Sequence, residues 1–144
     1  MADGHKDYST TPLWRKLGIG EGSRVRLVNA PDGFDEALVA IAPLPHAVDF
    51  LRRAAKGIDV AVLFATERKV LEGRFGALAT ALEPDGRLWV AWPKKASKVE
   101  TDLTFEIVQA HGLGGGLVDN KSAAIDEVFQ GLQFVYRVQD RPGR

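Results

Sequence analysis

The segment Ile58–Ala65 constrains the fold of this chain more than any other stretch. It is short, and it is apolar at every position except Asp59. A strand with this pattern is covered on both faces, as strands are in parallel sheets. Parallel neighbours are joined by crossover connections that usually contain a helix. This one segment therefore predicts an α/β fold.

Further strands are expected before and after this segment. They are Arg24–Asn29, Ala47–Phe50 and Leu88–Trp92, followed by a final pair, Leu117–Asp126 and Leu132–Val138. Too few residues separate the final pair for a parallel crossover, so these two strands should form an antiparallel hairpin. We therefore expect a three-layer α/β protein with a mostly parallel sheet and a C-terminal antiparallel hairpin.

Apolar residues at helical spacing predict the helices between these strands. One helix is expected over Thr11–Leu17, and three more carry the apolar sets Phe34/Leu38/Ile41, Leu71/Phe75/Leu78/Leu82 and Leu103/Ile107/Val108. Thr66 is a candidate cap for the third helix and Thr101 or Asp102 for the fourth, which Gly112 should end. The stretch Leu51–Lys56 is a candidate for a single helical turn.

Composition limits the function classes. The chain has 144 residues, 45% of them hydrophobic, and should form one domain, with flexible tails at 1–7 and 139–144. Lys+Arg and Asp+Glu both number 19, and this balance argues against nucleic acid or an anionic membrane as a partner. The absence of cysteine excludes disulfides and thiol catalysis. No membrane span or secretory signal is visible, so a cytoplasmic location is expected.

The best candidate site follows the Leu88–Trp92 strand. Ligands of open parallel sheets bind outside the carboxyl ends of the strands. The basic and hydroxyl side chains there are Lys94, Lys95, Lys98, Ser97 and Thr101. The helix that follows, capped by Thr101 or Asp102, offers free N–H groups to an anion. The loop is a candidate phosphate or carboxylate site, and the alternative is a solvated connection between strand and helix.

Two tryptophans lie on this same strand. Trp89 and Trp92 are three residues apart and should face opposite sides of the sheet. We expect Trp89 to pack in the core. Trp92, beside Lys94, is a candidate either for stacking on a planar ligand or for shielding the loop.

The loop after the first strand is a second candidate region, through Asn29 and Asp32. Nucleoside cofactors are usually approached here by a glycine pattern, G-x-G-x-x-G. That pattern is missing, and Pro31 removes a backbone donor. Asp49 lies about 20 residues beyond the first strand, which makes it a candidate for ribose hydroxyls or, alternatively, a solvated residue at a strand end.

No residue pattern indicates a reaction. The three histidines, His5, His46 and His111, lack the spacing of a metal site. The serines lie in no G-x-S-x-G elbow. Catalytic residues therefore remain unassigned, and neither a metal nor a bound cofactor is expected.

The last two-thirds of the chain resembles class I methyltransferases. Ile58–Phe64 is similar to their central buried strand, and Leu82–Val90 is similar to their turn into the next strand. An antiparallel pair also closes their sheet. The resemblance implies a Rossmann-like fold, with S-adenosylmethionine as a possible cofactor.

A second resemblance runs over nearly the whole chain. It is to a family of small bacterial proteins known only as a domain of unknown function, and it implies no activity. The strings that carry it are Tyr8-Ser9, Thr11–Leu13, Lys16–Ile19, Asn29–Pro31, Leu88–Val90, Trp92–Ser97, Thr101–Leu103 and Gly131-Leu132.

Three functions follow as hypotheses. The first is a non-catalytic binding or regulatory module that recognises a small anion or nucleotide at the strand ends. The second is a divergent S-adenosylmethionine-dependent transferase without the glycine-rich loop. The third is an assembly protein, in which the segment Gln133–Tyr136 at an exposed sheet edge pairs with a second copy or with a protein partner.

Overall fold

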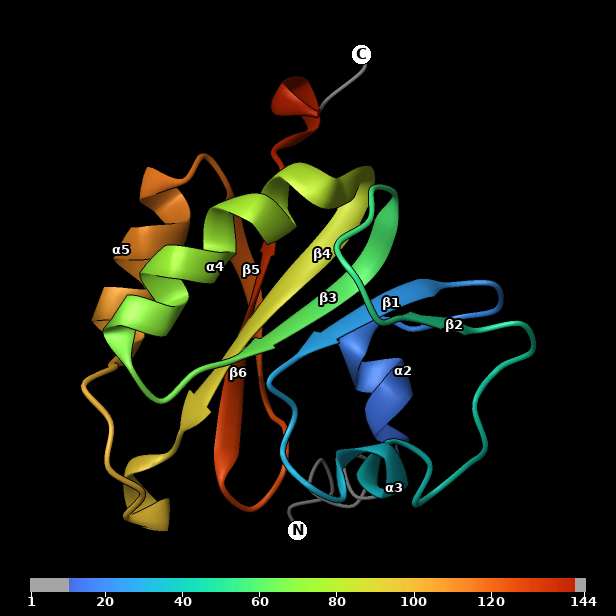
Figure 1. Cartoon of the computed structure of the whole chain (residues 1–144), viewed down its shortest axis with the longest axis horizontal. Coiled ribbons are helices and arrows are strands. Elements are labelled where there is room, and N and C mark those ends of the chain that lie inside the picture. Colours follow the sequence, from blue (N-terminus) through green and yellow to red (C-terminus); the bar gives the residue numbers. More distant parts are fainter. Residues whose placement is uncertain (1–10, 142–144) are drawn as a thin grey trace, which may run out of the picture.

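The computed structural model describes residues 11–141, and a six-stranded sheet runs through its middle (Figure 1). The strand order is β2-β1-β3-β4-β6-β5. The strands are β1 (Arg24–Val28), β2 (Asp49–Leu51), β3 (Ile58–Phe64), β4 (Leu82–Pro93), β5 (Val118–Ala124) and β6 (Phe129–Val135). The first four are parallel, and β6 is antiparallel to both β4 and β5. The mostly parallel sheet with a C-terminal hairpin is therefore confirmed.

Helices cover both faces of this sheet. They are α2 (Leu13–Leu17), α3 (Phe34–Leu38), α4 (Arg68–Ala81) and α5 (Phe105–Gly114), with short 3-10 turns η1 (Lys95–Ser97) and η2 (Val138–Asp140). Figure 1 shows α4 and α5 on one face and α2 and α3 on the other, and the core forms two corresponding clusters. This is the expected three-layer arrangement. The predicted tail at 1–7, the string Tyr8-Ser9 and residues 142–144 lie outside the described residues.

The central strand β3 is buried on both faces, as its sequence predicts. Val60, Val62 and Phe64 face α2 and α3, whereas Ala61, Leu63 and Ala65 face α4 and α5. All six are at most 4% exposed. Trp89 and Trp92 also belong to opposite clusters, so both predictions about sheet faces are confirmed.

The apolar stripe of α4 is buried as predicted, but the expected end of α5 is wrong. Leu71, Phe75 and Leu78 pack on the sheet, whereas the fourth predicted member of the stripe, Leu82, is buried but begins β4. Helix α5 continues past Gly112 and ends at Gly114. A Cβ atom at Gly112 would overlap the ring of Phe134, so this glycine serves the close packing of α5 on β6.

Three smaller expectations are also wrong. Helix α3 ends at Leu38, where the N–H groups of Val39 and Ala40 close the last turn with short-range bonds, and Ile41 is 53% exposed. The expected helical turn at 51–56 begins inside β2, because Leu51 pairs with Arg26 of β1. Most of the segment Gln133–Tyr136 lies in β6, between β4 and β5, so it is not at a sheet edge.

Candidate functional site

The carboxyl ends of the parallel strands bring several segments to one edge of the sheet. Strands β1, β3 and β4 end there at Val28, Phe64 and Pro93. Because β6 runs antiparallel to β4 and β5, the end of β5 at Ala124 and the start of β6 at Phe129 lie at the same edge. This edge holds both regions that the sequence singles out.

The loop after β4 has a folded backbone and free ammonium groups. The backbone N–H of Lys94 donates to Val128 O at 2.7 Å, which ties the loop to the hairpin. Ser97 Oγ donates to Lys94 O at 2.7 Å and accepts from the N–H of Val99 at 3.2 Å. The Ser97 hydroxyl therefore shapes the loop. In the part of the chain that the structure describes, Lys94, Lys95 and Lys98 form no ion pair.

Thr101 and Asp102 hold the far end of this loop against the start of α4. Thr101 Oγ1 donates to Thr66 O at 2.6 Å, and Asp102 Oδ1 accepts from the N–H of Arg68 at 2.7 Å. Asp102 therefore satisfies a free N–H group at the N-terminus of α4. The prediction that Thr66 caps α4 is wrong, because Asp102 of the neighbouring loop caps that helix. The prediction that Thr101 or Asp102 caps α5 is also wrong. Thr104 caps α5, accepting from the N–H of Ile107 at 3.2 Å.

A hollow of about 630 Å³ opens between this loop and the first turn of α5. We call it the lysine hollow. Its polar and charged lining residues are Lys94, Lys95, Lys98, Glu100, Thr101, Thr104, Glu106 and Gln130, and its main apolar ones are Trp92, Val99, Leu103 and Phe105. The volume is in the range of small-molecule sites. Three lysines and two glutamates thus line one hollow beside a helix N-terminus.

A second hollow, of about 470 Å³, adjoins it beside the hairpin. We call it the hairpin hollow. It shares Trp92, Lys94, Phe105 and Gln130 with the lysine hollow and adds Ser122, Ala123, Ala124 and Gly131. Trp92 is only 2% exposed, whereas the Phe105 side chain is 41% exposed. Phe105 therefore offers the larger free aromatic surface at the meeting of the two hollows.

Of the eight predicted site residues, the structure gathers four around the lysine hollow: Trp92, Lys94, Lys95 and Thr101. Ser97 and Asp102 hold the loop by hydrogen bonds. The sequence reasoning missed Phe105 and Gln130. Phe105 lies outside the apolar stripe of α5, and this position predicts that its side chain is exposed. Gln130 comes from the hairpin, and no local pattern marks it.

Of the remaining two, Asn29 lies at the crevice between β1 and β3, where the chain reverses its winding, and Asp32 is exposed in the loop after β1. In doubly wound sheets this switch point is the usual ligand site. Asn29 has a positive φ of 61°, and its Nδ2 donates across the crevice to Phe64 O at 3.4 Å. The ring of Phe34 packs edge-on against Phe64 with centroids 4.9 Å apart. Side chains of the protein thus span and line this crevice.

Asp49 is not at this crevice, contrary to the prediction. It opens β2 and pairs with Arg24 at the start of β1, so it lies at the amino ends of the strands. The strand begins later than the sequence pattern indicates, at Asp49 itself. Exposed Arg52 and Arg53 follow the carboxyl end of β2.

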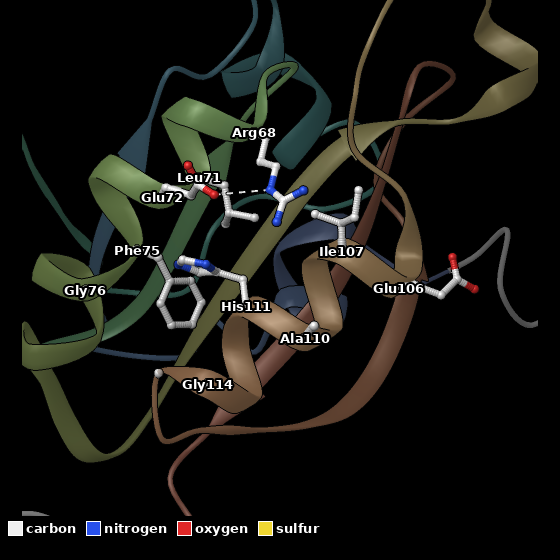
Figure 2. Close-up of a pocket in the computed structure, with 11 residues that line it drawn as sticks. Arg68, Leu71, Glu72, Phe75, Gly76, Glu106, Ile107, Ala110, His111 and Gly114 are labelled. Carbon is white, nitrogen blue, oxygen red and sulfur yellow. Dashed lines mark hydrogen bonds and ion pairs between the residues drawn. The ribbon is translucent and has the colours of Figure 1, made fainter.

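The described residues assemble no recognisable set for acid–base or metal chemistry. Within residues 11–141 no group of His, Asp and Glu is placed to hold a metal ion. A groove of about 630 Å³ between α4 and α5 has Leu71 and Phe75 in its lining, and Figure 2 shows the His111 ring against Phe75. Their centroids are 5.2 Å apart. The Arg68–Glu72 ion pair at 3.1 Å lies along the same groove. His111 thus serves packing.

Among residues 11–141, the titratable group with a shifted pKa is Tyr136, and it lies away from this edge. Burial raises the pKa of the Tyr136 phenol above its ordinary value. Its hydroxyl donates to Ala79 O at 2.7 Å, and Tyr136 directly follows the carboxyl end of β6, which is the opposite edge of the sheet. We assign it a structural role. No helix among the described residues has the length and apolarity needed to cross a membrane.

Solved structures with a similar fold include S-adenosylmethionine-dependent methyltransferases. A TehB-like S-adenosylmethionine-dependent methyltransferase from Corynebacterium glutamicum aligns with a TM-score of 0.53 and 10% identity over 87% of this chain and 85% of that one. A putative type 11 methyltransferase from Sulfolobus solfataricus aligns with a TM-score of 0.54 and 12% identity over 92% of both chains. LepI in complex with S-adenosylmethionine aligns with a TM-score of 0.55 and 14% identity, but the match covers 48% of LepI and 90% of this chain.

These likenesses concern the fold, because the identities are low. Scans against family models and curated proteins found no match, so the resemblance to a family of unknown function is not confirmed. The expected methyltransferase-like, Rossmann-like fold is confirmed. At these identities the likeness establishes the fold and assigns no activity to this chain. They give no support to the expectation that the chain needs no cofactor.

The residues at the switch point do not fit S-adenosylmethionine held in the usual manner. A carboxylate at the end of the second strand would accept hydrogen bonds from the ribose, but Arg52 and Arg53 follow β2 and only donate. Asn29 bridges the crevice, and Pro31 replaces a backbone donor. We therefore derive no reaction step through this cofactor.

Proposed function

We propose that this chain uses a methyltransferase-like fold to bind a small anionic molecule in the lysine hollow. One observation carries the proposal: Lys94, Lys95 and Lys98 line a single hollow at the carboxyl edge, beside the capped N-terminus of α5. Unpaired ammonium groups and the positive end of a helix both favour an anion. The proposed role is recognition, with the cytoplasm as the proposed place of action.

A second candidate function is a divergent S-adenosylmethionine-dependent transferase. The likeness in fold to methyltransferases favours it. The residues at the switch point oppose it, because they lack the glycine loop and the ribose carboxylate. Such an enzyme would have to hold the cofactor by other groups than those of the usual site.

Thermal unfolding with added ligands separates these two functions. The probes are inorganic phosphate, S-adenosylmethionine and S-adenosylhomocysteine, tested on wild type, Lys94→Ala/Lys95→Ala and Arg52→Ala/Arg53→Ala. The arginine variant is a matched control, because it also removes two cations from the carboxyl edge. A ligand at a hundredfold excess over Kd stabilises by about 2.7 kcal/mol.

We expect phosphate to stabilise wild type and the arginine variant but not the lysine variant. Stabilisation by S-adenosylmethionine that survives in the lysine variant would favour the transferase instead. A phosphate effect that is equal in all three proteins, or no effect of phosphate on wild type, overturns the anion site.

A further inference from the structure

The meeting of the lysine hollow and the hairpin hollow indicates which anion this site takes. The two hollows share Trp92, Lys94, Phe105 and Gln130, so one elongated ligand can occupy both. We propose that the ligand is a nucleotide, with its base on Phe105 and its phosphate at the lysines. This inference rests on the proposed anion site and adds the chemical class of the ligand.

The hairpin hollow supplies what a nucleobase requires. The Phe105 ring is 41% exposed at its border, although most large apolar side chains of the chain are buried. Aromatic rings stack on any base, because every base has a π face. The lining of the hairpin hollow also includes the small residues Ala123, Ala124 and Gly131, which leave room for a flat ring.

Polar groups in this hollow match the edge of a base. The amide of Gln130 donates to Pro93 O at 3.3 Å through Nε2, and in the described chain its Oε1 accepts no hydrogen bond. The Ser122 hydroxyl also makes none there. Both groups can therefore exchange hydrogen bonds with a base without breaking a bond inside the protein.

The two carboxylates of the lysine hollow favour a nucleotide over a bare anion. Glu100 and Glu106 line the same hollow as the three lysines, and an inorganic phosphate bound at the lysines makes no use of them. Figure 2 shows Glu106 pointing away from the residues of the α4–α5 groove, although it lines that groove as well. A carboxylate accepts hydrogen bonds from ribose hydroxyls, as the acidic residue of a dinucleotide site does. The base, the ribose and the phosphate of a nucleotide would therefore each contact a group of the protein that suits it.

Calorimetric titration of the full chain with adenosine monophosphate, ribose 5-phosphate and inorganic phosphate tests this inference. We expect adenosine monophosphate to bind about tenfold more tightly than ribose 5-phosphate, which has no base to stack. Phe105→Leu should abolish that difference and leave the affinity for ribose 5-phosphate unchanged. Phe50→Leu is the matched control, because Phe50 is 37% exposed on the edge strand β2, and it should change neither affinity.

Each outcome decides a separate point. Equal affinities for ribose 5-phosphate and adenosine monophosphate in wild type overturn the nucleotide and leave the anion site standing. No binding of any of the three probes overturns the anion site and the nucleotide together. Should Phe105→Leu fail to fold, nuclear Overhauser contacts between the adenine protons and the Phe105 ring in wild type take its place, and their absence from the bound complex overturns the inference.

Discussion

Two places at the same edge of the sheet differ in what their side chains do. At the crevice between β1 and β3, Asn29 spans the strand ends, and the rings of Phe34 and Phe64 pack on each other. Beside β4, the lysine hollow is open, and Phe105 is 41% exposed. The fold brings both places to the edge where ligands of open parallel sheets usually bind, but local residues decide which one is open. A fold therefore indicates where a site can be, whereas its ligand follows from the residues present.

Phe64 at the crevice and Phe105 at the lysine hollow should differ most in their contribution to stability. Phe64→Ala should lower the free energy of unfolding by about 3–5 kcal/mol, because it empties a site 2% exposed between two other rings. Phe105→Ala should lower it by about 1 kcal/mol or less, because that ring is half in solvent. Urea unfolding measures both. Equal losses would contradict the contrast between a packed and an open place.

The next effect concerns the bridge across the crevice. Asn29→Ala should cost about 2 kcal/mol, because it removes the bond to Phe64 O and places alanine at a φ of 61°. Asn29→Gly removes the same bond but accepts a positive φ, so it should cost about 1 kcal/mol. Urea unfolding compares the pair. If glycine proved as destabilising as alanine, the backbone conformation at Asn29 would not be the strained feature.

A smaller loss of stability is expected when the contact between the loop after β4 and the start of α4 is removed. Asp102→Ala should cost about 1 kcal/mol, because it removes the cap on the N–H of Arg68 in α4. Glu100→Ala is the control, since Glu100 is an exposed carboxylate of the same loop that makes no bond to a helix start. Chemical denaturation measures both variants. A loss of similar size in Glu100→Ala would indicate a general charge effect in place of a cap.

Removing the Lys95 side chain should affect phosphate binding but hardly affect stability. Lys95→Ala should change the free energy of unfolding by no more than about 0.5 kcal/mol, because the side chain is exposed and forms no ion pair in the described chain. It should nevertheless weaken phosphate binding in calorimetry. A clearly destabilised variant would mean that the lysine supports the loop.

The caps show why only part of the site follows from the sequence. Thr101 and Asp102 are residue types that cap helices, but neither caps the helix that follows them, α5. The helix that Asp102 caps is α4, which precedes it in the chain and reaches it only in the folded protein. Phe105 and Gln130 likewise meet only because the hairpin returns beside α5. Local patterns identify the kind of interaction, but they do not identify the partner.

The elements of this protein follow from its amino-acid sequence: the doubly buried β3, the apolar stripe of α4, the final hairpin and hence the α/β class. These features repeat at short range, since the burial of each residue follows the period of its own strand or helix. Three further features depend on how the chain folds in space. The switch-point crevice is bridged, Asp49 lies at the amino ends of the strands, and the lysines share a hollow with Phe105 and Gln130. These outcomes depend on contacts between segments far apart in the chain, and no local pattern encodes the distances between them.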